Sequence, residues 1–312
     1  MIRLARSRRV TALVQGQQRL ESLSRRFVGG PSASHAVECA AELRRKGIAA
    51  SMFFLGEYVT DPSVVAVTVR QLTEVIELTA EHDLDVCASV DPTQIGLMID
   101  EDTATRNARV LAEAVAQAAG HRPWHGHDAL MVDMEDATVT DATLALHRTL
   151  SDAGLPVAVT IQAYLHRTRD DLPELIARGG WIRLVKGAFA EPATVAARHT
   201  ADTDSRYRQA AALLLAPSSR DAGAYPVFAT HDHRIIDEIA TLAAANGWPP
   251  DAYEFEMLFG VRPDFQQELV RRGHRVRVYL PFGQAWFPYS IRRVGESPRN
   301  LRFAVSAVAR RN

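Results

Sequence analysis

The sequence predicts an α/β fold of the (β/α)8 type, a closed TIM barrel, and three observations carry this prediction. Eight short runs of aliphatic, β-branched and aromatic residues recur along the chain, as expected of strands that are buried on both faces of a parallel sheet. Segments with helical periodicity separate these runs. The chain has 312 residues, and eight strand and helix units in that length indicate a closed barrel rather than an open sheet.

The expected strands follow one another from about residue 48 onward. In order, they are IAASMFFL at 48–55, LDVCASV at 84–90, ALMVDM at 129–134, PVAVTIQ at 156–162, WIRLVKG at 181–187, YPVFAT at 225–230, AYEFEML at 252–258 and HRVRVYL at 274–280. Turn or cap residues bound each run, which is typical of strands that end at a loop.

The segments between the strands have the periodicity of helices, for example at 63–81, 140–152 and 233–245. Several of them open with Asp, Thr or Pro, which are favoured at helix starts. No low-complexity or charged linker divides the chain. We therefore expect one domain over residues 1–312, with N-terminal helices in 1–46 and the barrel in 47–312.

Composition narrows the functional class. The net charge is −1 and the pI is about 6.8, so no overall electrostatic bias favours nucleic acid or another polyanion. Cys39 and Cys87 lack metal-type spacing and suit free thiols in a reducing compartment. No apolar run approaches the roughly 20 residues that span a bilayer. We expect a cytoplasmic protein that acts on small molecules.

The first residues leave two interpretations open. Arg3, Arg6, Arg8 and Arg9 lie among aliphatic residues, so this stretch is either a solvated capping helix or an amphipathic helix that touches anionic lipid. The second alternative would place the protein peripherally at the inner face of a membrane.

Polar residues follow or end the apolar runs, and in this fold the active site is built at the carboxyl ends of the strands. In strand order they are Glu57; Asp91, Thr93 and Gln94; Asp133, Glu135 and Asp136; Gln162 and Tyr164; Arg183 and Lys186 with Gly187 and Ala188; Thr230, His231 and Asp232; Glu256; and Tyr279. Because all these strand ends meet at one rim, the sequence predicts a polar site there.

Part of this set has a second interpretation. Asp136, Thr230 and Asp232 begin loops that lead into helices, where such residues often serve only as N-caps.

A further group lies near the C-terminus, in a short helix delimited by Pro288 and Pro298. Tyr289, Arg292, Arg293 and Glu296 are spaced i, i+3, i+4 and i+7, and so share one helical face. Two adjacent guanidinium groups can hold a carboxylate through charge-assisted hydrogen bonds. The alternative is a solvent-facing surface with an Arg292–Glu296 pair.

The ordered motifs of this chain resemble those of the proline dehydrogenase family over about residues 50–305. They are FFLGEYV at 53–59, VDMED at 132–136, VTIQAYLHRT at 159–168, RLVKGAFAEP at 183–192, ATHD at 229–232, YEFEMLFGVR at 253–262 and RVRVYLPFGQAWFPYSIRRVGESPRN at 275–300. The resemblance implies a distorted barrel with a C-terminal helix that caps the substrate, and an FAD cofactor across the carboxyl ends of the strands.

The resemblance also implies roles for individual residues. Asp133 and Arg183 would be catalytic. Arg183 would also belong to the flavin-binding set, with Met134, Gln162, Val185, Lys186, Gly187, Ala188, Thr230, His231 and Glu256. Arg292 and Arg293 would clamp the substrate carboxylate, Tyr279, Tyr289 and Leu258 would wall the substrate ring, and Glu57 would act as a gate.

The implied reaction is oxidation of L-proline to 1-pyrroline-5-carboxylate, by hydride transfer from the ring carbon beside the nitrogen to flavin N5. The protein would orient the ring while the flavin supplies the redox chemistry. The electrons would pass to an acceptor that in this family is often a membrane quinone.

Three positions depart from the family pattern. Asp91 stands where the family usually has a lysine that partners the substrate carboxylate, Phe189 replaces a tyrosine, and Glu256 replaces a glutamine. A carboxylate beside the substrate carboxylate would repel it unless one is protonated or a further cation intervenes. An alternative is therefore a divergent member that oxidises a substituted cyclic amino acid, and a second is a flavin-binding protein without turnover.

A metal-dependent amidohydrolase barrel is a rival from another enzyme class, because Thr230-His231-Asp232-His233 with Lys186 superficially resembles its metal ligands. Such enzymes need His-x-His on the first strand, where this chain has Phe53-Phe54-Leu55. The histidines at 121, 125 and 127 precede the third strand, at the opposite rim. We therefore expect no metal.

Overall fold

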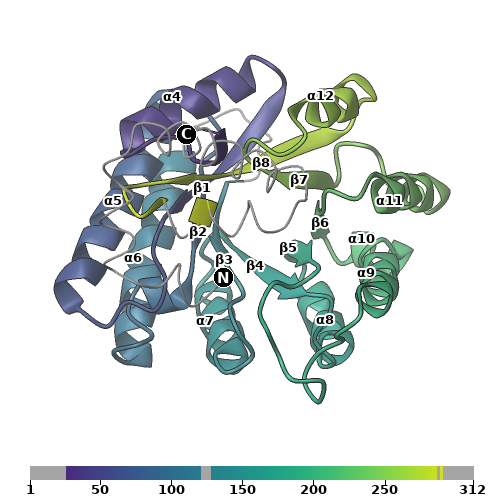
Figure 1. Ribbon diagram of the computed structural model, residues 1–312, viewed down its shortest axis with the longest axis horizontal. Coiled ribbons are helices and arrows are strands. Elements are labelled where there is room, and N and C mark those ends of the chain that lie inside the picture. The colour runs from purple at the N-terminus through teal and green to yellow at the C-terminus, as the bar shows by residue number, and fades with distance from the viewer. Residues whose placement is uncertain (1–25, 121–127, 287–288, 291–312) are drawn as a thin grey trace, which may run out of the picture.

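A computed structural model describes residues 26–120, 128–286 and 289–290 of the chain. Eight parallel strands close into a barrel in sequence order, from β1 to β8 and back to β1. Helices surround the strands (Figure 1). The predicted (β/α)8 barrel is confirmed.

The strands match the predicted runs with small shifts at their ends. They are β1 (Ile48–Phe54), β2 (Cys87–Val90), β3 (Ala129–Val132), β4 (Val157–Gln162), β5 (Gly180–Val185), β6 (Ala224–Ala229), β7 (Glu254–Leu258) and β8 (Arg275–Phe282). The start of β2 moves from residue 84 to Cys87. The reason is that the Val86 amide donates to the Asp128 side chain at 2.5 Å instead of joining a strand ladder.

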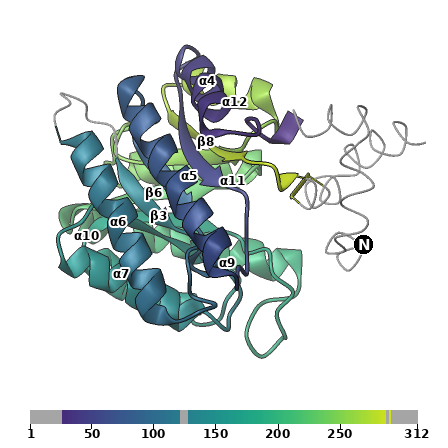
Figure 2. The same cartoon turned by 90° about the vertical axis from the view of Figure 1, so that its left-hand side faces the viewer.

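The helices lie in the predicted intervals. They are α4 (Ala33–Arg44), α5 (Pro62–Glu81), α6 (Glu101–Ala119), α7 (Thr140–Asp152), α8 (Thr168–Ala177), α9 (Thr200–Leu214), α10 (Pro217–Asp221), α11 (His233–Ala245) and α12 (Pro263–Arg271), with a 3-10 turn η1 (Pro92–Gln94) after β2. Helices α5, α6 and α7 pack side by side on the outer surface (Figure 2). Of the expected N-terminal helices, α4 falls within the described residues.

Strand alternation divides the core into two regions. On β5, Ile182 and Leu184 point outward into the large apolar cluster beneath the helices, whereas Trp181 packs with Tyr225 inside the barrel. Arg183 is two residues after Trp181 and therefore points inward as well. Every second residue of a strand therefore points into the barrel, from its floor to its carboxyl-terminal rim.

The lower part of the barrel interior holds a buried charge network. Arg277, which is fully buried, donates to Glu254 at 2.8 Å, to Asp85 at 2.9 Å and to the carbonyl of Ala50 at 2.9 Å. Its guanidinium lies 5.0 Å from the centre of the Trp181 ring. Because each charge is paired and hydrogen-bonded, this layer is a closed floor beneath the site.

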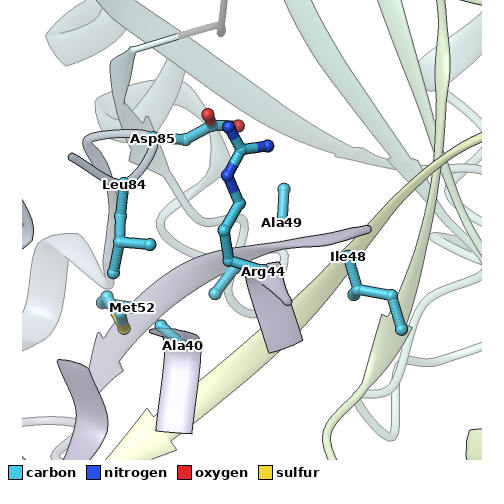
Figure 3. Close-up of a pocket in the computed structure, with 8 residues that line it drawn as sticks. Ala40, Arg44, Ile48, Ala49, Met52, Leu84 and Asp85 are labelled. Atoms are coloured by element: carbon cyan, nitrogen blue, oxygen red, sulfur yellow. The ribbon is translucent and has the colours of Figure 1, made fainter. Parts of the chain in front are cut away.

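A small pocket lies at the amino-terminal ends of the strands, between α4 and β1 (Figure 3). Ala40, Ile48, Leu84 and Asp85 are among the residues that line it, and its volume of about 10 Å³ suits a single water molecule. It is far from the polar rim. Within the described ranges, no helix is both long and apolar enough to cross a membrane.

Candidate active site

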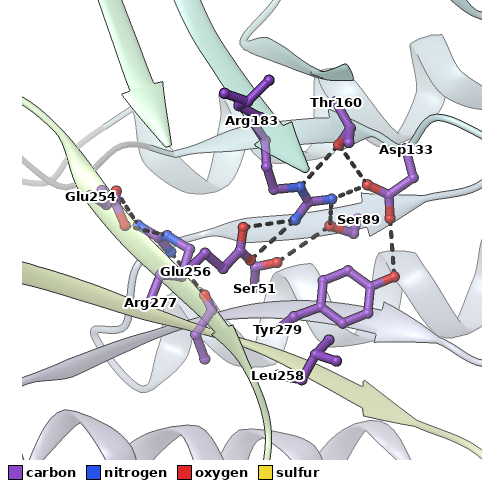
Figure 4. A network of polar contacts seen from close by, with 12 residues as sticks. Ser51, Ser89, Asp133, Thr160, Arg183, Glu254, Glu256, Leu258, Arg277 and Tyr279 are labelled. Atoms are coloured by element: carbon purple, nitrogen blue, oxygen red, sulfur yellow. Dashed lines mark hydrogen bonds and ion pairs between the residues drawn. The ribbon is translucent and has the colours of Figure 1, made fainter. Parts of the chain in front are cut away.

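Arg183 is the centre of a buried polar network at the upper end of the barrel (Figure 4). Its Nε donates to Thr160 Oγ1 at 2.9 Å, and its Nη1 donates to both carboxylate oxygens of Glu256, at 3.0 and 3.1 Å. Its Nη2 contacts Ser89 Oγ at 3.3 Å and donates to Asp133 Oδ1. Strands β2, β4, β5 and β7 and the end of β3 thus fix one guanidinium group.

Asp133 accepts hydrogen bonds on both of its carboxylate oxygens. Oδ1 accepts from Arg183 and from Thr160 Oγ1, the latter at 2.9 Å, and Oδ2 accepts from the Tyr279 hydroxyl at 3.0 Å. Burial of its hydroxyl and the negative charge of Asp91 hold the pKa of Tyr279 well above its usual value. The phenol therefore keeps its proton and acts as a donor.

The network carries one positive charge between two carboxylates. Arg183, Asp133 and Glu256 are each less than a tenth exposed. With both carboxylates ionised, their sum is one net negative charge. An excess negative charge in a poorly solvated place is stabilised by a bound cation or by the removal of one charge.

Asp91 lies one layer above Ser89 on the same inward face. Its backbone is extended, with φ −82° and ψ 126°, so strand alternation continues through it. The Asp133 amide donates to the Val90 carbonyl at 2.9 Å, which places the ends of β2 and β3 side by side. Asp91 therefore lies at the mouth of the Arg183 network.

The rim at β4, β5 and β6 carries the residues expected to contact a flavin. Gln162 is buried and donates through Nε2 to the Glu135 carbonyl at 2.6 Å. Val185, Lys186 and Gly187 are partly exposed, and Ala188 is exposed. Met134 and Thr230 are buried, and they follow the ends of β3 and β6.

Lys186 is paired with acidic side chains of the helical layer. Its ammonium donates to Asp204 of α9 at 2.5 Å and lies 3.7 Å from Asp232. Asp232 also accepts the amide of Arg234 as the N-cap of α11, so the alternative N-cap interpretation is confirmed for this residue. Thr230 Oγ1 accepts the Asp232 amide at 3.2 Å, and thus shapes the same turn.

His231 has a defined tautomer. Its Nε2 accepts the backbone amide of Leu258 at 3.0 Å, so the neutral ring carries its proton on Nδ1. This bond ties the end of β6 to β7 and places Leu258, expected to wall the substrate, next to the same rim.

Only glycine fits at position 187. Its φ is +115°, a conformation that other residues rarely adopt, and an added Cβ would fall about 2.1 Å from the Tyr164 ring. The backbone after β5 therefore lies directly against Tyr164.

The predicted substrate wall is partly described. Tyr279 stacks on Phe53 with ring centres 5.3 Å apart, and Tyr289 is buried in the cluster that also contains Phe27 and Leu55. Glu57 is partly buried on the loop after β1. Arg292 and Arg293, with the rest of the predicted capping helix, lie outside the described residues.

Three members of the network were missed at the sequence level. Ser51, Ser89 and Thr160 lie within strands rather than after them, and Ser51 and Ser89 contact each other at 3.3 Å. For Ser89 and Thr160 the available signal was a hydroxyl residue two positions before a predicted rim residue, Asp91 and Gln162 respectively; Ser51 had no such signal. Among the described residues, no group of three or more acidic, histidine or cysteine side chains lies so as to hold a metal ion.

The sequence of this chain is similar to that of known proteins over nearly its whole length. The family model described as "Proline dehydrogenase" matches residues 36–305. A proline dehydrogenase of Deinococcus radiodurans is 36% identical over 297 residues, which covers 94% of this chain and 92% of that one. Proline dehydrogenase 1 of Bacillus subtilis is 33% identical over 289 residues, covering 92% and 91%. The chain belongs to the proline dehydrogenase family.

Solved structures agree on the fold of this proline dehydrogenase family member. Proline utilization A from Bdellovibrio bacteriovorus, inactivated by N-propargylglycine, superposes with a TM-score of 0.79 at 21% identity over 90% of this chain. The protein of the same name from Corynebacterium freiburgense gives 0.75 at 19% identity over 96%. The chain spans about a third of these longer proteins, 33% and 34% respectively.

The family implies a flavin cofactor, and the donor set at the rim fits one. Val185 and Gly187 are partly exposed and Ala188 is exposed, at and after the end of the strand that carries the inward-facing Arg183. The Lys186 ammonium, the Gln162 amide and the His231 ring come from the ends of the neighbouring strands β4, β5 and β6, and this set of polar groups suits a planar ring with polar edges and an anionic tail. Two of these cations, Arg183 and Lys186, already have carboxylate partners that would hold them in place.

Proposed function

We propose that the protein oxidises L-proline to 1-pyrroline-5-carboxylate with FAD as its cofactor. The observation that supports this most strongly is the set Asp133, Arg183 and Tyr279, which β3, β5 and β8 bring together in a chain of the proline dehydrogenase family. Oxidation removes a hydride from the ring carbon beside the nitrogen and a proton from the nitrogen, which leaves a carbon–nitrogen double bond. The bound flavin supplies the two-electron acceptor.

The chain's own residues would orient the substrate and shape its surroundings. We assign the catalytic positions to Asp133 and Arg183, and the bonds to Thr160 and Glu256 hold the Arg183 guanidinium in place. Tyr279 and Leu258 would form a wall for the substrate ring, since both follow the inward face of adjacent strands. Gln162, Val185 to Ala188, Thr230 and His231 would hold the flavin.

The direct test is turnover of purified protein with L-proline, an artificial electron acceptor and a reagent that traps the cyclic imine. The trapped product should accumulate in proportion to the acceptor reduced. Reduction of the acceptor without a trapped imine would overturn the proposed chemistry. If the protein turns over only other cyclic amino acids, the flavin assignment stands but L-proline is not the substrate.

A second candidate substrate is a cyclic amino acid with an additional amino group. Asp91 at the mouth and the net negative charge of the Arg183 network favour it, because both would attract a second cation. Replacement of Asp91 by Asn separates the two candidates. The variant should bind L-proline more tightly in either case, but should lose preference for the amino-substituted compound only if that compound is the substrate. Asp170→Asn, on the exposed surface of α8, is the matched control.

We further propose a quinone as electron acceptor and a cytoplasmic location with peripheral membrane contact, both of which rest on the family resemblance. A soluble quinone analogue should then reoxidise the reduced flavin faster than oxygen does. Equal rates with both acceptors would argue against a quinone.

A further inference from the structure

Glu135 is a buried carboxylate that the proposed chemistry does not use. It follows β3 at 2% exposure, two residues after Asp133. Oε2 accepts the backbone amide of Thr93 at 2.9 Å, and Oε1 accepts the Thr93 hydroxyl at 2.5 Å. One carboxylate thus binds both donors of a single residue in the turn that follows β2.

Thr93 in turn holds the loop that follows β1. Its Oγ1 accepts the Tyr58 amide at 2.9 Å, and its carbonyl accepts the Val59 amide at 3.1 Å. The hydroxyl therefore has a fixed direction: it donates to Glu135 and accepts from Tyr58. Thr93 thus attaches residues 56–61, which include Glu57, to the barrel rim through its side chain and its carbonyl.

Tyr58 shows that the loop is held in a specific shape. Its φ is +53°, which is unfavourable for a residue with a side chain and persists only when the surroundings fix it. A second bond, from the Tyr58 hydroxyl to Asp136 Oδ2 at 2.6 Å, attaches the loop to the segment after β3. Two links, through Thr93 and Asp136, therefore oppose relaxation of this loop.

We propose that Glu135 is a positioning residue, which holds residues 56–61 and Glu57 at the mouth of the active site through Thr93. The inference rests on the proposed function only where it identifies the mouth as that of an active site. The attachment of the loop through Thr93 can be tested without turnover. Glu135 does not reach the Arg183 network by any bond within the described residues. Its effect passes through Thr93.

The attachment should respond to pH near neutrality. Burial raises the pKa of Glu135 to about 7, the two Thr93 bonds lower it, and the negative charges of Glu57 and Asp136 raise it. Ionisation turns both Thr93 contacts into charge-assisted bonds, which are stronger than neutral ones. The repulsion from Glu57 and Asp136 acts over a longer distance and is the smaller effect. A rise in pH through about 7 should therefore tighten the loop.

Hydrogen exchange on peptides that cover residues 55–61 tests this proposal without any need for turnover. After correction for the intrinsic rate, protection of the wild-type loop should increase by about two- to tenfold from pH 6 to pH 8, the range expected of a single hydrogen bond. Glu135→Gln should remove this pH dependence. Thr93→Val should lower protection at every pH, and Thr93→Ser should restore it.

Thr143→Val is the matched control, because Thr143 is also buried but its hydroxyl bonds the carbonyl of Val139, the N-cap residue of its own helix. It should leave loop protection unchanged. The proposal fails if Glu135→Gln keeps the wild-type pH dependence, or if Thr93→Val leaves protection unchanged. If a variant does not fold, a wild-type loop whose protection does not rise from pH 6 to pH 8 still overturns the proposal.

Kinetics provide a second readout that a purely structural role would not produce. If the loop positions Glu57 at the mouth, Thr93→Val should raise KM for L-proline several-fold while kcat stays within about twofold. Equal loss of kcat and gain of KM would contradict the positioning role. If the protein does not oxidise L-proline at all, the exchange result still stands, so failure of the proposed function is distinguishable from failure of this inference.

Discussion

Tyr279 donates its hydroxyl to one oxygen of Asp133 at 3.0 Å, while Arg183 occupies the other oxygen. The two donors come from β8 and β5, which lie three positions apart in the closed barrel, and neither of these strands is a neighbour of β3. Asp133 is therefore held from both sides. The first three predictions concern the groups of this network.

Tyr279→Phe removes one donor from Asp133 and keeps the ring. The loss of a hydrogen bond to a charged group should weaken transition-state binding by about 1.5–3 kcal/mol, which corresponds to roughly a ten- to hundredfold loss in kcat/KM. Stability should fall by about 1–3 kcal/mol, because a buried Asp133 oxygen loses its donor although the ring still stacks on Phe53. An unchanged kcat/KM for L-proline would show that the Tyr279 hydroxyl has no role in catalysis.

Replacement of Arg183 by Met leaves Asp133 and Glu256 as two buried, unpaired carboxylates. Removal of one member of a buried ion pair costs about 3–5 kcal/mol of stability. Denaturant unfolding should show a loss of that order, with loss of bound flavin. Arg178→Met, a partly exposed arginine paired with Asp152, should lose no more than about 1 kcal/mol. Similar losses for both variants would mean that the Arg183 network does not support the barrel.

Glu256→Gln removes the surplus negative charge but keeps the side-chain shape. Arg183 would retain Asp133 as its ionic partner. Because reduction adds electron density to the flavin, loss of a nearby negative charge should raise its midpoint potential by about 30 mV, equivalent to about 1.4 kcal/mol for two electrons. Potentials measured against reference dyes check this shift. Glu174→Gln, on the exposed face of α8, should leave the potential unchanged; a fall in potential for Glu256→Gln would contradict the charge count.

His147 should make the fold sensitive to acid. Burial lowers the pKa of His147 to about 4, and the nearby Arg178 and Arg148 add to this effect. Well above the ordinary histidine pKa of about 6.5, the ring is neutral in both folded and unfolded chains. As the pH falls toward 4, His147 binds a proton in the unfolded chain but stays neutral in the folded chain. The free energy of unfolding therefore falls by about 1–3 kcal/mol.

Unfolding curves of the wild type and of His147→Leu from pH 7.5 to 4.5 check this linkage. The variant should lose less stability than the wild type over this range, because it lacks the titrating ring. Parallel loss in the two proteins would show that other groups account for the acid sensitivity.

The barrel was predictable because its strands are buried on both faces and leave an unusually plain apolar pattern. Strand ends were less certain, as Leu84–Val86 shows: the Asp128 side chain takes the Val86 amide before the ladder of β2 begins. Hydrophobic periodicity indicates which residues are buried, but it does not indicate which acceptor a backbone amide will bond. This is a tertiary property.

The rim residues were also predictable, because carboxyl ends of parallel strands meet at one edge. Their partners were not. Lys186 turned out to contact Asp204 of α9, a helical residue that no strand pattern singles out. The choice of Asp133 and Glu256 by Arg183, and of Thr93 by Glu135, depends on strand register and side-chain reach.

Anaerobic mixing of the purified flavin-bound protein with L-proline, followed by the absorbance of the oxidised flavin, tests the central claim most directly. We expect rapid bleaching by L-proline, with one imine formed for each flavin reduced, and strongly slowed bleaching in Tyr279→Phe. A flavin that stays oxidised with L-proline and with every hydroxylated and amino-substituted cyclic amino acid would contradict the account and leave a flavin-binding protein without this activity.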